Sequence, residues 1–160
     1  MNILGIDPGL GNTGYGIISD NAQIIDLVDY GVIKTSPKDN LAKRLKIIFN
    51  QISNLIDLHK PSIFSIEEVF YSNNIKTTMK LGQAKGAVLI AAAHFNLQVY
   101  EYSARKIKLS LTGNGNSTKD QVKFMVENRL KIDCKILKND ASDALAAALC
   151  HEQQFRFNDL

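Results

Sequence analysis

Apolar residues recur along this chain with two different spacings, first that of strands and then that of helices, which predicts an α/β fold. Residues 2–7 form a short, nearly continuous apolar run, and residues 15–19 and 23–34 are two further runs of strand type. Asp20 and Asn21 fit the turn between these two runs, because both residue types tolerate left-handed backbone geometry. Three strands joined by tight turns predict an antiparallel meander at the start of the chain.

After this meander the apolar spacing becomes that of helices. Steps of three or four residues predict an amphipathic helix over residues 40–59, which a Lys-Pro pair ends. A buried strand at 62–67, a helix rich in small residues at 76–95 and a strand at 97–102 are expected to follow. Strands that alternate with helices after a meander predict a mixed sheet with helices on both faces.

The last third of the chain is predicted to be mostly helical. Ser103 fits the N-cap of a short helix, and either Ser117 or Thr118 fits the cap of the next one. A final helix with an alanine-rich body is expected over residues 140–151. Residues 152–160 are polar and are predicted to form a frayed, flexible tail.

Length and composition favour one intracellular domain. The 160 residues are 45% hydrophobic, which suits a single domain over residues 2–151 with a full core. No apolar stretch reaches the roughly 20 residues that span a bilayer, so no membrane association is expected. Cys134 and Cys150 form no CxxC motif and no signal peptide precedes the first strand, which favours reduced thiols in a cytoplasm. The net charge of +3 excludes no class of partner.

Acidic residues occupy the positions where such a fold places its binding sites. Asp7 ends the first apolar strand, and Glu67 or Glu68 ends a later one. Asp140 and Asp143 are three residues apart and share one face of the first turn of the final helix. Each acid alone has an ordinary explanation, as a turn cap, a surface strand end or a helix N-terminal residue. If the final helix packs over the sheet, all of them meet in one cleft.

Four carboxylates in one cleft require a cation. Two unit charges about 4 Å apart repel by roughly 4 kcal/mol at an effective dielectric near 20. Oxygen donors without His or Cys favour Mg²⁺ or Mn²⁺ over zinc. Two such ions about 4 Å apart form the arrangement that cleaves phosphodiesters. Gly9, Gly11, Gly14 and Gly16 are interpreted as leaving room for a charged nucleic-acid backbone to reach these ions.

A family resemblance rests on segments spread over the chain. GIDPGLGNTGYG, SIEEVFYSNN, KLGQAKGA, EYSARKIKLSLTGNGNSTKDQV and DASDALAAAL resemble, in this order, the RuvC family of Holliday junction resolvases. The resemblance covers about residues 2–151. It implies an RNase H-like fold with a five-stranded mixed sheet flanked by helices on both faces. It also implies an endonuclease that resolves four-way junctions in recombination and repair by paired symmetric nicks, leaving 5′-phosphate and 3′-hydroxyl ends.

The resemblance assigns the catalytic, metal-binding carboxylates to Asp7, Glu67, Asp140 and Asp143. It selects Glu67 over Glu68, a choice that strand alternation alone leaves open. Two Mg²⁺ ions per subunit are implied, for which Mn²⁺ is expected to substitute.

The same resemblance extends to DNA and protein partners. Phe70 matches a position that stacks on a base near the crossover, and Lys108 and Lys119 match basic positions near the cleaved strand. Arg105, in the same basic stretch, is assigned to phosphate contact. A homodimer is implied, with the helix at 76–95 in its interface, and so is a branch-migration motor complex of RuvA and RuvB.

Three other functions compete with this reading of the sequence. Actin-like ATPases and sugar kinases also open on Asp-x-Gly after a first strand, but they need a second such half, which this chain lacks. A junction-binding scaffold without chemistry would be favoured by loss of any of the four acids, all of which are present. A generic RNase H-like nuclease differs in substrate, cutting RNA–DNA hybrids rather than branched DNA.

Overall fold

One five-stranded mixed sheet organises the chain, as predicted. The computed structural model describes residues 1–21, 24–69, 74–133 and 137–158. The strands lie in the order β3-β2-β1-β4-β5, with β1 to β3 antiparallel and with β4 and β5 parallel to β1. Their bounds are β1 (Asn2–Asp7), β2 (Asn12–Asp20), β3 (Ile25–Lys34), β4 (Ile63–Glu67) and β5 (Gln98–Tyr102).

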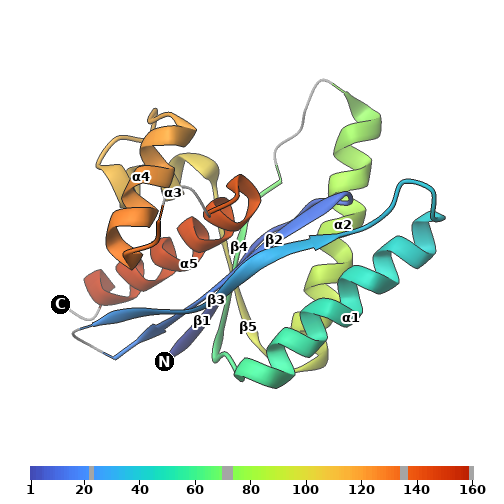
Figure 1. Cartoon of the computed structure of the whole chain (residues 1–160), viewed down its shortest axis with the longest axis horizontal. Helices are drawn as coiled ribbons and strands as arrows, with labels where there is room; N and C mark the ends of the chain where they lie inside the picture. Colours follow the sequence, from blue (N-terminus) through green and yellow to red (C-terminus); the bar gives the residue numbers. More distant parts are fainter. Residues whose placement is uncertain (22–23, 70–73, 134–136, 159–160) are drawn as a thin grey trace.

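Helices cover both faces of this sheet (Figure 1). One face carries α1 (Leu41–His59) and α2 (Ile75–His94), and the other carries α3 (Ala104–Thr112), α4 (Lys119–Leu130) and α5 (Asn139–Asn158). A separate apolar core fills the space on each side, so the centre of the sheet is buried on both faces. No helix in the described ranges is long and apolar enough to cross a membrane.

Polar side chains fix where the helices start. Asn40, Asn74, Ser103 and Thr118 each accept a hydrogen bond from the backbone N–H three residues further on. Such a cap satisfies a donor that the first turn of a helix leaves free. Of the two residues that the sequence offered as the cap of α4, Thr118 is the one that forms it, with a capping box.

Alternation along β1 and β4 turns their terminal acids to the same face of the sheet. Leu4 and Ile6 belong to the core under α1 and α2, so Asp7, the next residue, points to the α5 face. Ile66 also lies in the α1 and α2 core, so Glu67 points to the α5 face. Because Ile6 pairs with Ile66 in parallel register, Asp7 and Glu67 come out on neighbouring strands at the same level.

Helix α5 lies directly on the backbone of β1 and β2 because glycines leave room for it. A Cβ atom on Gly14 would lie 1.9 Å from the carbonyl oxygen of Asp140, and one on Gly5 would lie 2.1 Å from that of Ala144. Gly14 is the partner of Asp7 in the β1–β2 register. The contact that admits the helix therefore also brings Asp140 to the end of β1.

The proposed ligand-clearing role of the glycines is wrong for Gly14 and Gly16. Both face α5, and a Cβ atom on Gly16 would lie 2.4 Å from a methyl carbon of Leu145. Gly9 faces the carbonyl of its own turn, where an added Cβ atom would come within 2.2 Å of it. Of the four, Gly11 alone has open space around it, with its nearest neighbour 4.0 Å away.

Among the strands, β2 and β3 differ from their expected bounds by more than one residue. Strand β2 spans Asn12–Asp20 rather than residues 15–19, because Thr13 at its start is fully buried and pairs with β3. Strand β3 begins at Ile25 rather than at 23; residues 22–23 lie outside the described part of the chain.

The expected flexible tail at 152–160 is instead the end of α5 as far as Asn158. Glu152 has no exposed surface and is paired with Arg129 of α4 at 3.2 Å and with Arg156. Arg156 in turn reaches Asp20 at the end of β2, at 2.9 Å. These polar residues have partners on α4 and the sheet, which the sequence alone does not reveal, so the helix continues.

The glycine contact generates a stability prediction. We expect Gly14→Ala to lower the free energy of unfolding by about 1–3 kcal/mol, because the added methyl group must push α5 away from the sheet. Gly11→Ala is the matched control, since its methyl group enters open space. Urea unfolding of both variants measures the difference, and equal stabilities would contradict the packing described here.

Candidate active site

The four candidate carboxylates lie within electrostatic range of one another. Asp7 ends β1, Glu67 ends β4, Asp140 stands in the first turn of α5, and Asp143 follows three residues further along the same helix. The pKa of Asp7 is raised to about 8, first by burial and then by the charges of Asp143, Glu67 and Asp140. Lys119 acts in the opposite direction on the same group. The site therefore gathers negative charge that its own residues neutralise only in part.

Opposing effects also act on the pKa of Glu67. Burial raises its pKa and the charge of Asp143 raises it further, whereas Lys119 and Lys108 lower it. Carboxylates from two strands and a helix thus share two ammonium groups from the α3–α4 side of the site. Because the carboxylates outnumber the ammonium groups, the site favours the binding of cations.

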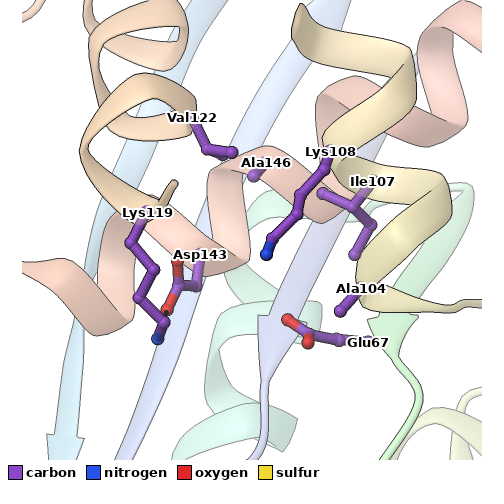
Figure 2. A pocket seen from close by; sticks show the side chains of 8 residues that line it. All are labelled: Glu67, Ala104, Ile107, Lys108, Lys119, Val122, Asp143 and Ala146. Atoms are coloured by element: carbon purple, nitrogen blue, oxygen red, sulfur yellow. Dashed lines mark hydrogen bonds and ion pairs between the residues drawn. The ribbon is translucent and has the colours of Figure 1, made fainter. Parts of the chain in front are cut away.

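Two pockets meet at Glu67. The first, of about 120 Å³, lies between the sheet edge and the three helices α3, α4 and α5 (Figure 2). Its lining residues are Glu67, Ala104, Ile107, Lys108, Lys119, Val122, Asp143 and Ala146. The second, of about 210 Å³, is lined by Asp7, Pro8, Glu67, Glu68, Val69 and Leu81.

Two lysines enter the first pocket from different helices. Lys119 is the first residue of α4, and its Nζ lies 3.0 Å from Oδ2 of Asp143. Figure 2 shows the Lys108 side chain descending from α3 between Asp143 and Glu67. Ile107 and Val122 are buried in the core against α5, so the helices that carry both lysines are fixed relative to the acids.

Ser65 is a positioning residue that the sequence did not reveal. It is fully buried in β4, and its hydroxyl donates a 2.8 Å hydrogen bond to the carbonyl oxygen of Ala147 in α5. This bond ties the helix to the strand that ends in Glu67. The signal available in the sequence was a small polar residue two positions before the acid, on the same face of the strand.

An edge of adjacent parallel strands, a helix turn laid across it and two facing lysines match what the sequence resemblance implies. The family model described as Crossover junction endodeoxyribonuclease RuvC matches residues 3–151. This chain belongs to the RuvC family.

Relatives in the RuvC family match it over nearly their whole length. The RuvC of Natranaerobius thermophilus is 41% identical over 156 residues, covering 98% of this chain and 97% of that protein. The RuvC of Aliivibrio fischeri strain MJ11 is 46% identical over 149 residues, covering 93% of this chain and 85% of that protein. Both are described as crossover junction endodeoxyribonucleases.

A solved RuvC structure has the same architecture. Thermus thermophilus RuvC in complex with a Holliday junction substrate superposes with a TM-score of 0.93 at 31% identity, covering 99% of this chain and 96% of that one. The fold is RNase H-like, as the resemblance implied.

The remaining candidate DNA contacts of the RuvC family fall in different places. Arg105 is exposed on α3 and lies against the loop at Gly115, and it is not among the described residues that line the first pocket. Phe70 lies outside the described residues. Lys108 and Lys119 are thus the basic candidates that the structure places beside the acids.

Divalent ions fit the donor set of this site. The candidate ligands offer carboxylate oxygens only, which suits Mg²⁺ or Mn²⁺. The pKa of Asp7 is raised by burial and then by the neighbouring carboxylates, whose repulsion a cation would relieve. Within the described ranges, no three Asp, Glu, His or Cys side chains converge closely enough to hold one ion as they stand. Since Asp143 is held by Lys119, filling the site requires the side chains to rearrange.

The charge surplus predicts a pH-dependent stability for the metal-free protein. Asp7 keeps its proton in the folded state up to a pKa of about 8, whereas the unfolded chain releases it near 3.8. The free energy of unfolding therefore falls as the pH rises between these values. We expect the free energy of unfolding of Asp7→Asn to decrease by about 1–3 kcal/mol less over this pH range than that of the unaltered protein, because the amide never ionises.

Thermal unfolding in EDTA at pH 5 and pH 8 measures this effect. The stability gain of Asp7→Asn over the unaltered protein should be larger at pH 8. Asp26→Asn, at an exposed position in β3, is the control and should follow the unaltered protein at both pH values. Parallel pH profiles for all three proteins would contradict the assignment.

Proposed function

We propose that this protein is a Holliday junction resolvase. It would cut four-way DNA junctions by paired symmetric nicks during recombination and repair, leaving 5′-phosphate and 3′-hydroxyl ends. The observation that carries the proposal is the group of four acids beside two lysines in a RuvC fold. The related Thermus thermophilus structure, which holds a Holliday junction substrate, supports the choice of branched DNA over an RNA–DNA hybrid.

The proposed catalytic residues are the four carboxylates, Asp7, Glu67, Asp140 and Asp143. They would hold two Mg²⁺ ions per subunit, with Mn²⁺ able to substitute. When bound, such ions lower the pKa of the attacking water and stabilise the leaving 3′ oxygen. The spacing of the carboxylates is set by the fold, because β1, β4 and α5 all contribute residues to one apolar core.

The lysines are proposed to handle the phosphate. Lys108 on α3 and Lys119 on α4 line the same pocket as Glu67 and Asp143, so a phosphate that enters the pocket would meet ammonium groups beside the carboxylates. Their charge offsets the repulsion between the phosphodiester and the acidic cluster. Arg105, exposed on the outer side of α3, is proposed to contact phosphates further along the strand. Phe70 is proposed to stack on a base near the crossover, as its motif implies.

We infer that the protein acts as a homodimer through the outer face of α2. Ile75, Met79 and Ile90 are 75%, 60% and 63% exposed, and Gly82 and Gly86 lie between them with open space beyond their backbone. These residues fall on one stripe of the helix, and their small members allow close approach of a second helix. A two-fold dimer presents two equal sites to a junction of similar symmetry.

Membership of the family supports three further proposals. The nuclease domain is proposed to be one unit spanning residues 2–151. A branch-migration motor of RuvA and RuvB is proposed to deliver the junction, and the cytoplasm is the proposed location.

The metal assignment predicts the behaviour of Asp143→Asn. We expect this variant to cut a labelled synthetic junction at least about 100-fold more slowly in Mg²⁺, because one ion loses a ligand. Its junction affinity in EDTA should not fall, since Asp143 holds an ion rather than DNA and its removal frees Lys119. Asp120→Asn, at an exposed position in the first turn of α4, is the matched control. Cutting by Asp143→Asn at the normal rate would overturn the assignment.

The dimer face predicts a second outcome. Ile90→Glu should convert the protein to a monomer in sedimentation velocity and replace paired cuts by independent single nicks, because it buries a charge in the interface. Leu58→Glu makes the same change at a 73% exposed position on α1 and should leave the dimer intact. If Ile90→Glu stays dimeric, the interface lies elsewhere.

A further inference from the structure

One ammonium group serves the acidic site as a built-in counterion. Lys119 Nζ lies 3.0 Å from Asp143 Oδ2, and its charge also acts on Asp7 and Glu67. Figure 2 shows the lysine stem running from the start of α4 down to the carboxylate of Asp143 on α5. The capping box around Thr118 fixes the backbone from which this stem departs. The backbone end of this ion pair is therefore held in place beside the carboxylate.

The contact is built to be exchanged. The Lys119 side chain is 78% exposed, whereas that of Asp143 is 21% exposed. An ion pair with one largely solvated partner is weak and is screened by salt. Breaking it leaves Lys119 in water at little cost, but it leaves Asp143 among other carboxylates, where a replacement cation is needed.

Lys108 provides an internal comparison. It lines the same pocket and its charge acts on Glu67, so it shares the electrostatic field of the site. In the described ranges, however, it makes no ion pair with a carboxylate. The two lysines therefore contribute similar charge, but only Lys119 occupies a proposed ligand.

The geometry points to Lys119 as a tethered cation that occupies Asp143 in the metal-free protein and is released toward the substrate phosphate when the site takes up a divalent ion. This inference rests on the proposed function, because it requires Asp143 to be an ion ligand. One ammonium group then has two alternative partners, a carboxylate before loading and a phosphate after it. By linkage, occupancy of the site by a divalent ion and phosphate binding by Lys119 favour each other.

Binding of Mn²⁺ to the DNA-free protein tests this inference without any measurement of cutting. Calorimetric titration should show that Lys119→Met binds Mn²⁺ about two- to five-fold more tightly than the unaltered protein, because the competing cation is gone. Lys108→Met removes the same charge from the same pocket and should give less than half of that gain. Equal gains in the two variants, or no gain in Lys119→Met, would overturn the inference.

Side-chain NMR of the lysine ammonium groups follows the exchange directly. The Lys119 signal, assigned by its absence in Lys119→Met, should shift on addition of Mg²⁺ with the midpoint of ion binding. A signal that stays unchanged while the ion binds would also overturn the inference.

Asp143→Asn separates the two levels of the proposal. If this variant loses Mn²⁺ binding while the two lysine variants behave alike, Asp143 is confirmed as a metal ligand and only the proposed exchange of Lys119 for the ion is wrong. If Asp143→Asn binds Mn²⁺ as tightly as the unaltered protein, the proposed function loses its metal ligand.

Discussion

The direct contact of α5 with the backbone of β1 and β2 is the constraint on which the site depends. An ordinary helix packs on a sheet through a layer of side chains, which would hold Asp140 and Asp143 well above the strand ends. Here Gly5 and Gly14 remove that layer, and helix carbonyl groups lie against the sheet itself. Carboxylates from a helix and from two strands can share charge only because the two layers are this close.

This closeness has an electrostatic cost that the protein carries until a cation arrives. Burial and three neighbouring acids together raise the pKa of Asp7, and Lys119 of α4 offsets only part of their effect. A folded core on each side of the sheet supplies the stability that tolerates such repulsion. Function and stability therefore oppose each other at this edge of the sheet, as at many sites built to bind ions.

Features that depend on residues close together in the sequence could be predicted, and features that depend on residues far apart in the sequence could not. Local rules gave the helix starts at Asn40 and Ser103, because a cap depends on residues three positions apart. The ends of the apolar strands also pointed to Asp7 and to Glu67 or Glu68, and the family resemblance then selected Glu67. The purpose of Gly14 could not be found this way, since its neighbour in space is Asp140, 126 positions away in the chain. The partners of Glu152 were hidden for the same reason, and a polar run was mistaken for a tail.

The ion pairs in the last turns of α5 help to fix a helix that carries two of the four acids at its other end. Glu152 stands nine residues beyond Asp143, about 13 Å further along the same rod at 1.5 Å per residue. Arg129 and Asp20 clamp that end to a neighbouring helix and to the edge of the sheet. These ion pairs oppose any shift or rotation of α5 on the backbone of β1 and β2. The position of Asp140 and Asp143 at the start of α5 thus also depends on ion pairs formed several turns further along the helix.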